Sequence, residues 1–223
     1  MVETKIVRTR SEKSELIYDI HEFCINADTR ELFLHSYIDD SEESGVDYRM
    51  ASRFEKNLRI LTALNDNPIL IHMHTIGGNW YDGMAIYDTI KGNPLHITIL
   101  AYANARSMSS IILQAADYRI MMPHTCFMIH EGSDGYDGTH RGFITHAEEA
   151  KLAAETMLNI YTEKCSNGEK LKGKTNRAIK TFLQSKMDKQ QEWYLTARDS
   201  VKYGFADAVL GDEGCENIKK LLE

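Results

Sequence analysis

The chain has 223 residues, of which 43% are hydrophobic and 26% are charged. This composition is typical of a folded globular protein and excludes a chain that is disordered throughout, and the length suits a single domain spanning residues 1–223. The 33 acidic residues exceed the 26 basic ones, so the formal net charge is −7. Because phosphate binding needs a basic patch or stripe, the sequence predicts no nucleic-acid partner.

The N-terminal residues Met1–Lys13 mix charged side chains with single apolar ones, so they lack the apolar core of a secretion signal. The longest apolar run, Ile97–Ala105, is interrupted by polar residues and falls short of the roughly 20 residues that span a bilayer. We therefore expect a cytoplasmic protein with no membrane partner. Four widely spaced cysteines fit reduced thiols better than a disulfide framework or a zinc site. They are Cys24, Cys126, Cys165 and Cys215.

Strands and helices alternate along the first 130 residues, which predicts a largely parallel sheet built from βαβ connections. A glycine, Gly92, followed by Pro94 predicts that the helix before them ends in a left-handed cap. The predicted strands are Glu31–Ile38, Ile69–His74, Leu95–Ala103, Tyr118–Met122 and Cys126–His130. The predicted helices are Tyr48–Leu64, Asn79–Lys91 and Met108–Ala116.

The alternation stops after His130. Four glycines punctuate a polar segment between Gly132 and Gly142, and Phe143–Cys165 is predicted to form one long helix. Its small and apolar residues recur at spacings of three and four, which is typical of a helix packed on another helix. We therefore expect this helix to take part in a subunit contact.

The last part of the chain predicts a solvated lysine-rich turn, Lys164–Lys180, which leads into a further helix. Within Leu195–Leu210 we expect a helix that begins at Thr196, a turn at Tyr203–Gly204 and a short strand near Ala206–Leu210.

The glycine pair Gly77–Gly78 follows a predicted strand and precedes a predicted helix. Such a turn can expose backbone N–H groups at the positive end of a helix, where they bind an anion or a developing oxyanion. A thioester enolate or a phosphate would suit it equally well. The alternative is a glycine pair that serves only a tight turn.

Ser107 lies where a predicted strand gives way to the helix that begins at Met108. A hydroxyl held at a sharp strand-to-helix turn stands out from the sheet, and the next N–H is an oxyanion donor, so the position suits a nucleophile. The alternative is that Ser107 caps the helix.

His130 ends a predicted strand at the edge where α/β sites gather, which suits a general base. A structural histidine is the alternative, since eight others are present. His72 and His74 share one face of a strand, but no third ligand with metal-site spacing accompanies them, so we expect no metal.

Taken in order, these segments resemble the ClpP family, the serine-peptidase subunits of Clp proteases. The resemblance covers about residues 30 to 210. The Ser-Met and Met-Ile-His pieces are its most specific parts. The matching segments are Thr75-Ile76-Gly77-Gly78, Gly83-Met84-Ala85-Ile86-Tyr87-Asp88-Thr89, Ala105-Arg106-Ser107-Met108, Met128-Ile129-His130, and Ala197 through Tyr203-Gly204-Phe205-Ala206-Asp207.

The resemblance implies an α/β fold of the crotonase/ClpP type, with repeated ββα units and a protruding handle helix. It implies a serine endopeptidase with Ser107 as nucleophile, His130 as general base and Asp188 as the acid that orients the imidazole. Asp199 competes for that place but also suits a helix cap. The N–H groups of Gly78 and Met108 would form the oxyanion hole.

The resemblance also divides the chain into an N-terminal segment (1–25) and a handle region (132–166). The segment Gly132–Gly142 would be an edge strand that accepts an extended peptide, and the long helix would stack one ring on another. It implies two stacked homo-oligomeric rings of six or seven subunits each, unfolded protein substrates, an AAA+ unfoldase such as ClpX or ClpA as partner, and no cofactor. The chain itself has no phosphate loop for ATP.

Three departures from the family pattern affect the site. Ile76 stands where the family usually has proline, Arg106 replaces a small residue before Ser107, and Ser109 replaces a glycine. Bulky residues after the glycine pair, Asn79-Trp80-Tyr81, predict an altered substrate pocket. The departures keep two alternatives open: a catalytically impaired ring or regulatory subunit, and a crotonase-type enzyme acting on an acyl-CoA thioester.

Overall fold

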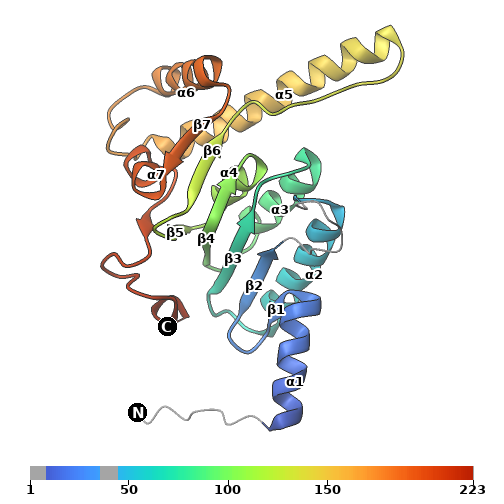
Figure 1. Cartoon of the computed structure of the whole chain (residues 1–223), viewed down its shortest axis with the longest axis vertical. Coiled ribbons are helices and arrows are strands. Elements are labelled where there is room, and N and C mark those ends of the chain that lie inside the picture. Colours follow the sequence, from blue (N-terminus) through green and yellow to red (C-terminus); the bar gives the residue numbers. More distant parts are fainter. Residues whose placement is uncertain (1–8, 36–44, 223) are drawn as a thin grey trace.

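The computed structural model describes residues 9–35 and 45–222. An eight-stranded sheet forms its centre and helices pack against it (Figure 1). The helices are α1 (Arg10–Tyr18), α2 (Tyr48–Leu64), α3 (Trp80–Lys91), α4 (Met108–Leu113), α5 (His140–Cys165), α6 (Asn176–Gln190) and α7 (Ala197–Tyr203), with shorter turns η1 (Asp19–Phe23) and η2 (Ile218–Leu222). The strands are β1 (Ile25–Asn26), β2 (Glu31–His35), β3 (Ile69–Thr75), β4 (Ile97–Arg106), β5 (Tyr118–Met121), β6 (Cys126–Ile129), β7 (Trp193–Thr196) and β8 (Ala208–Val209).

The sheet confirms the predicted βαβ organisation. Its order is β1-β2-β3-β4-β5-β8, and every pair from β2 to β8 is parallel. The long strand β4 changes partner along its length: Thr98–Ala101 pairs with β5, and Asn104–Arg106 pairs with β6. β6 in turn pairs antiparallel with β7. The split of β4 brings the carboxyl ends of β3, β4 and β6 to one edge of the molecule.

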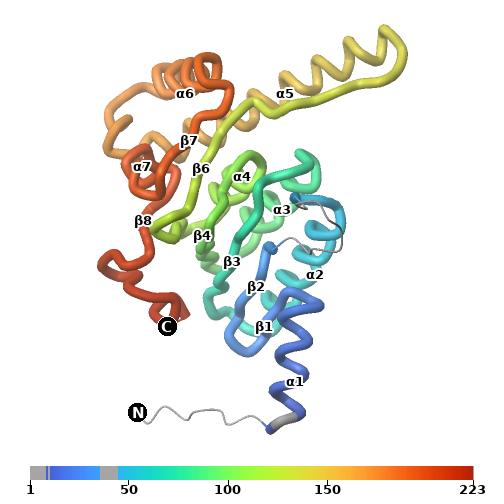
Figure 2. The backbone as a smooth tube through the Cα atoms, in the orientation of Figure 1, coloured from blue at the N-terminus to red at the C-terminus, as the bar shows by residue number. Residues whose placement is uncertain are grey.

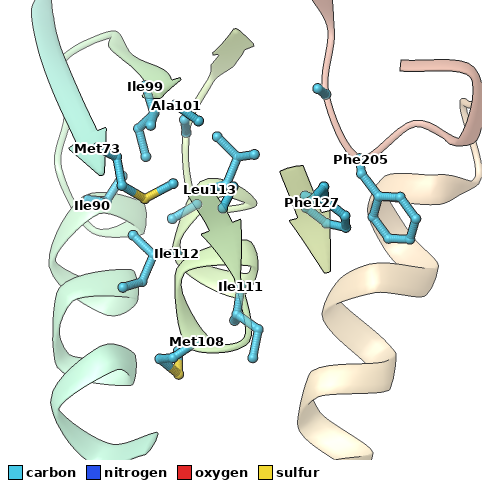
Figure 3. Close-up of a cluster of buried hydrophobic side chains, with 14 of the residues drawn as sticks. Met73, Ile90, Ile99, Ala101, Met108, Ile111, Ile112, Leu113, Phe127 and Phe205 are labelled. Atoms are coloured by element: carbon cyan, nitrogen blue, oxygen red, sulfur yellow. The ribbon is translucent and has the colours of Figure 1, made fainter. Parts of the chain in front are cut away.

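The core lies between the sheet and helices α2, α3 and α4. Figure 3 shows side chains of α4 lying among those of β3, β4 and α3, with Phe127 and Phe205 further along the same layer. All six residues of α4 are buried. Because each buried aliphatic side chain contributes about 1.5–3 kcal/mol, this packing fixes α4 and the turn that leads into it.

The elements predicted between Glu31 and His130 agree with the structure except at a few boundaries. The predicted α2 has the observed bounds, and β2 is confirmed as far as His35, while residues 36–38 lie outside the described part of the chain. The predicted left-handed cap at Gly92 is wrong, because this residue is right-handed with φ −81°. Its N–H bonds Asp88 O at 2.8 Å, and the next N–H bonds Ile90 O, so a tighter turn ends α3 instead. α4 stops at Leu113, where i to i−3 bonds replace the helix.

The long helix α5 projects away from the sheet, as predicted for the handle (Figure 1). It begins three residues earlier than expected, because Thr139 Oγ1 accepts the Gly142 N–H and caps it. Only its C-terminal half is buried, through Met157, Tyr161 and Cys165 among others. No helix among residues 9–35 and 45–222 is long and apolar enough to cross a membrane.

The segment before α5 differs from the expected edge strand. Residues 130–139 form no strand in the structure, and the last part of Gly132–Gly142 is already helical. Figure 2 shows this segment running beside α5 to its tip. A strand is assigned through its ladder of hydrogen bonds, and no described strand lies within reach of this segment.

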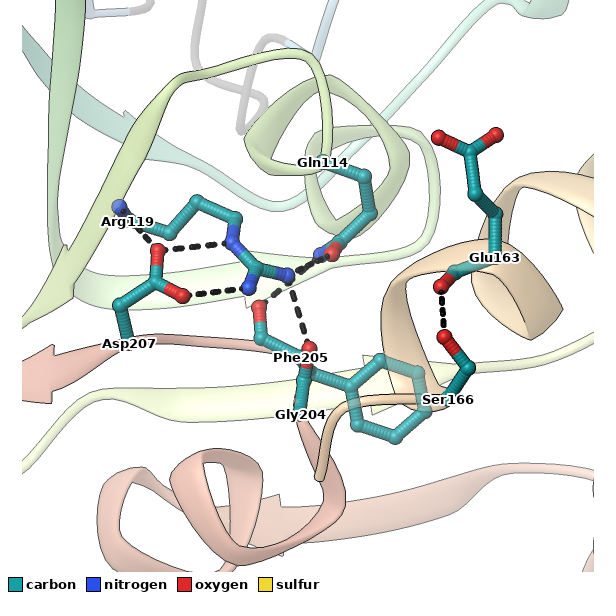
Figure 4. A network of polar contacts seen from close by, with 7 residues as sticks. All are labelled: Gln114, Arg119, Glu163, Ser166, Gly204, Phe205 and Asp207. Carbon is teal, nitrogen blue, oxygen red and sulfur yellow. Dashed lines mark hydrogen bonds and ion pairs between the residues drawn. The ribbon is translucent and has the colours of Figure 1, made fainter. Parts of the chain in front are cut away.

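The C-terminal part is tied to the sheet by a buried ion pair (Figure 4). Asp207 accepts from the backbone N–H of Arg119 and from its guanidinium, at 2.6–2.9 Å. The same guanidinium donates to Gly204 O and to Gln114 Oε1, each at 2.8 Å. The Arg119 side chain is only 9% exposed, so its charge depends on these partners.

Replacing Asp207 by alanine is expected to lower the free energy of unfolding by about 3 kcal/mol, because the buried Arg119 loses its counter-charge. The control is Arg198→Ala, which removes an ion pair in which the Arg198 side chain is 61% exposed and should change that free energy by less than about 1 kcal/mol. Urea denaturation at one protein concentration measures both. Equal losses in the two variants would contradict the structural role of Arg119.

Candidate functional site

Ser107 occupies a strained turn between β4 and α4. Its backbone has φ 53° and ψ −128°, a conformation that a residue with a side chain rarely adopts. The turn is held by its own N–H, which donates to Met128 O of β6 at 3.0 Å, and by its carbonyl, which accepts from Ser110. Ser107 is at the N-cap position, yet its hydroxyl makes no capping bond to the helix. The side chain is therefore free to point elsewhere.

The Ser107 hydroxyl lies against His130. Ser107 Oγ and His130 Nε2 are 2.7 Å apart, the separation expected between a nucleophile and its base. Burial lowers the pKa of His130 from its usual 6.5, and the nearby Glu192 carboxylate acts in the opposite direction. The net shift keeps the imidazole neutral at physiological pH, as a proton acceptor must be.

Two serines after Ser107 fix the turn to its surroundings. Ser109 Oγ lies 2.7 Å from both Thr75 O of β3 and Arg106 O of β4, and it accepts the Arg106 N–H. Ser110 Oγ is within 2.6 Å of Ser107 O and of the buried Tyr161 hydroxyl on α5. The sequence showed Ser109 only as a departure from the family glycine. Its bridging role depends on contacts between strands, which spacing along the chain does not reveal.

The glycine pair packs directly on this turn. A Cβ on Gly77 would lie 2.6 Å from Ser107 Cβ and 2.8 Å from Met108 N, and its φ of +104° also favours glycine. Gly78 forms a bridge with Val46 whose two hydrogen bonds run from Val46 N to Gly77 O and from Asn79 N to Val46 O. The bridge leaves the Gly78 N–H unused.

The second predicted donor belongs to the residue that follows Ser107. Met108 is the first residue of α4, where an N–H has no acceptor within the helix. Gly77 brings the glycine turn within contact distance of that N–H. The N–H groups of Gly78 and Met108, predicted as oxyanion donors, therefore belong to segments that touch each other at the Ser107 turn.

Asp188, the predicted acid, is not bonded to His130 in this structure. It lies near the end of α6, where its carboxylate accepts from Gln184 Nε2 at 2.9 Å. Gln184 Nε2 also donates to Glu131, the residue after His130. The Gln184 amide therefore links Asp188 to the neighbour of His130 and not to His130 itself. Among the described residues, the His130 ring has Ser107 as its one hydrogen-bond partner. Asp199, the competing acid, does not cap α7: Thr196 is the N-cap, and its Oγ1 accepts the Asp199 N–H at 3.1 Å and donates to Asp199 Oδ2 at 2.8 Å.

Sequence reasoning missed β7, which brings Glu192 and Tyr194 to the site. Trp193 and Leu195 are buried while Tyr194 and Thr196 are exposed, an alternation that predicts a strand. The charged residues at the end of α6 obscure it. Tyr194 donates to Glu192 Oε2 at 2.6 Å, and neither residue carried a prediction.

The structure also shows what His72 contacts. His72 is buried, and its two ring nitrogens are each 2.8 Å from a partner, Tyr102 OH and Glu31 Oε1. A ring with both nitrogens bonded this way serves the packing of the sheet. No group of three histidine, cysteine or acidic side chains within residues 9–35 and 45–222 is placed to hold a metal ion.

Comparison with known proteins shows which family the chain belongs to. The family model described as Clp protease matches residues 25–213. An ATP-dependent Clp protease proteolytic subunit of Deinococcus radiodurans is 27% identical over 175 residues, which cover 77% of this chain and 79% of that protein. The ATP-dependent Clp protease proteolytic subunit 2 of Pseudomonas aeruginosa is 26% identical over 171 residues, covering 76% and 79%. The match over most of the chain, together with the α/β fold, shows that this chain belongs to the Clp protease family.

Proposed function

We propose that this chain is a serine endopeptidase subunit with Ser107 as nucleophile and His130 as general base. The observation that carries the proposal is the 2.7 Å contact between Ser107 Oγ and His130 Nε2 at a strained turn. A crotonase-type acyl-CoA enzyme would have no use for this pair. Family membership supports peptide bonds as the substrate.

The proposed reaction is a serine acyl transfer. Ser107 Oγ attacks the scissile carbonyl carbon while its proton passes to His130 Nε2. The N–H groups of Gly78 and Met108 stabilise the oxyanion, and the imidazolium then protonates the leaving amine. In the second half of the reaction, water attacks the acyl group and gives its proton to His130, which returns a proton to Ser107 Oγ as the acid product leaves. The family assigns the orienting acid to Asp188, and we keep it in the proposal. A rotation of the Gln184 amide would break its bond to Asp188 and free the Asp188 carboxylate.

The assembly is also a proposal. We expect rings stacked through α5, whose outer half carries exposed apolar side chains that include Phe143, Ile144 and Leu152. Apolar groups of this size on a projecting helix favour burial against other subunits. The names of the relatives, which are ATP-dependent proteases, support an AAA+ unfoldase that delivers unfolded polypeptide.

A catalytically impaired ring or regulatory subunit is the second candidate. It is favoured by one observation, the bond of Asp188 to Gln184 in place of His130. Without an acid on Nδ1, the tautomer and orientation of the base are less well defined.

Treating the assembled protein with a fluorophosphonate should add one phosphonyl group per chain, because the neutral His130 activates the hydroxyl beside it. Intact-mass analysis measures the adduct. Ser107→Ala and His130→Ala should both remove it, and the parent should also cleave a short unstructured peptide. No adduct on the parent would overturn the peptidase and favour the impaired subunit.

The rate of labelling should increase with pH and reach half its maximum below pH 6.5. Labelling needs neutral His130, and burial lowers the pKa of that group from 6.5, so deprotonation is complete at a lower pH than for a free imidazole. Rates measured from pH 4.5 to 8 in one buffer series test this. A midpoint well above 6.5 would contradict the buried, neutral base.

Replacing Gly77 by alanine should slow labelling by about 100-fold, because the added Cβ displaces the Ser107 turn and an oxyanion donor. Gly211→Ala is a matched control: its φ of +103° is nearly the same as the +104° of Gly77, but a Cβ there meets nothing within 4 Å. Both variants have the backbone strain, and only one has the clash. Similar labelling rates for the two would contradict the packing of Gly77 on the site.

A further inference from the structure

An acidic residue, Glu192, immediately precedes β7, the strand that pairs with β6. β6 and β7 pair antiparallel, with Met128 opposite Tyr194 and Ile129 opposite Trp193. Continuing that register by one residue sets Glu192 opposite His130. Side chains directly opposite in an antiparallel pair have Cβ atoms about 4.5–5.5 Å apart.

Glu192 and His130 also share a face of this strand pair. Ile129 and Trp193 are buried, and Trp193 packs on Phe205 in the core. His130 follows the last residue of β6 and Glu192 precedes the first residue of β7, so continuing the alternation of strand side chains by one residue directs both to the opposite face. This is the face on which Ser107 Oγ meets His130.

A neighbour on the same face holds the carboxylate. Tyr194 donates its hydroxyl proton to Glu192 Oε2 at 2.6 Å, and this bond is the main reason that the pKa of Tyr194 is raised. Arg106, opposite Met128 on β4, interacts with Tyr194 from the other side. Its buried Nε has no hydrogen-bond partner. Arg106, Tyr194 and Glu192 are therefore a cation, a phenol and a carboxylate that interact in a row.

Other charged groups around His130 are directed elsewhere. Glu131, next in the chain, and Asp188, on α6, both accept from the Gln184 amide. Arg106 is the cation on β4, and Glu192 is the acid immediately before β7. Of these groups, Glu192 is the one whose charge acts on the pKa of His130, which it raises against the larger effect of burial.

We propose that Glu192 is a positioning residue for the base, held by Tyr194 and stabilising the imidazolium that forms when His130 Nε2 takes the Ser107 proton. The inference rests on the proposed function, and it assigns a role to a residue outside the Ser107, His130 and Asp188 set. The proton passes only from Ser107 Oγ to Nε2, and Glu192 keeps its negative charge throughout. A nearby negative charge favours the protonated form of the base.

Glu192→Gln tests the proposal, because it keeps the shape of the side chain and removes its charge. The first measurement is the pH dependence of His130 modification by diethyl pyrocarbonate, followed by peptide mapping, which reports the protonation of this ring independently of Ser107. The midpoint should fall by roughly half a pH unit for this partly screened charge. The maximal rate of fluorophosphonate labelling should fall about threefold, the factor that corresponds to half a pKa unit.

Glu131→Gln is the matched control. It makes the same change of charge one residue from His130, at a side chain bound to Gln184, and should leave the midpoint of modification unchanged. Tyr194→Phe removes the bond that holds Glu192 and should shift the midpoint in the same direction as Glu192→Gln, by a smaller amount.

The outcomes separate the inference from the proposed function. An unchanged midpoint in Glu192→Gln, or an equal shift in Glu131→Gln, would overturn the role of Glu192 even if Ser107 is labelled. Absence of label from the parent would overturn the peptidase, and the modification midpoints would still decide whether Glu192 acts on His130.

Discussion

The strained backbone at Ser107 is the constraint on which the candidate site depends. A φ of 53° at a residue with a side chain costs on the order of 1–3 kcal/mol, so the neighbouring structure must impose it. Three contacts do so: the bond from Ser107 N to Met128 O, the Ser109 hydroxyl between β3 and β4, and the Ser110 hydroxyl against Tyr161. Each contact involves a different element. The bond to Met128 depends on the pairing of β6 with the end of β4, and the bond to Tyr161 depends on α5 packing against the core.

The two faces of β6 and β7 divide packing from chemistry. On the inner face, Phe127 and Trp193 pack against Phe205, Trp193 edge to face. The adjacent Arg119 network joins this end of the chain to α4 through Gln114. On the outer face lie His130, one residue after the end of β6, and Glu192, one residue before the start of β7. Alternation along a strand thus ties the direction of the His130 and Glu192 side chains to the register of the aromatic core. A slip by one residue would bury the base and expose the aromatic rings.

Local sequence predicted the residues that act at element ends and failed where a partner comes from a distant element. Ser107 and His130 follow the ends of strands, and Gly77 and Gly78 precede a helix. The order of strands and helices along the chain therefore places all four at one edge of the sheet. The Asp188 assignment depends on the direction of a side chain on α6, and in this structure the Asp188 carboxylate is bonded to Gln184. The edge strand at Gly132–Gly142 was expected from resemblance, but a strand needs a paired neighbour. β7 was missed because its two inward residues follow a run of charges.

The protonation of the base and the stability of the fold depend on different groups. The turn and the glycine corner are held by buried hydroxyl and backbone bonds, so changes there alter geometry. The carboxylates near His130 are exposed: Asp188, Glu131 and Glu192 all lie at the surface. An exposed charge contributes little to folding but still acts on a half-buried imidazole a few ångströms away. The acid side of this site can therefore vary between related chains, with effects on the pH range of the base and without loss of the α/β core that positions Ser107.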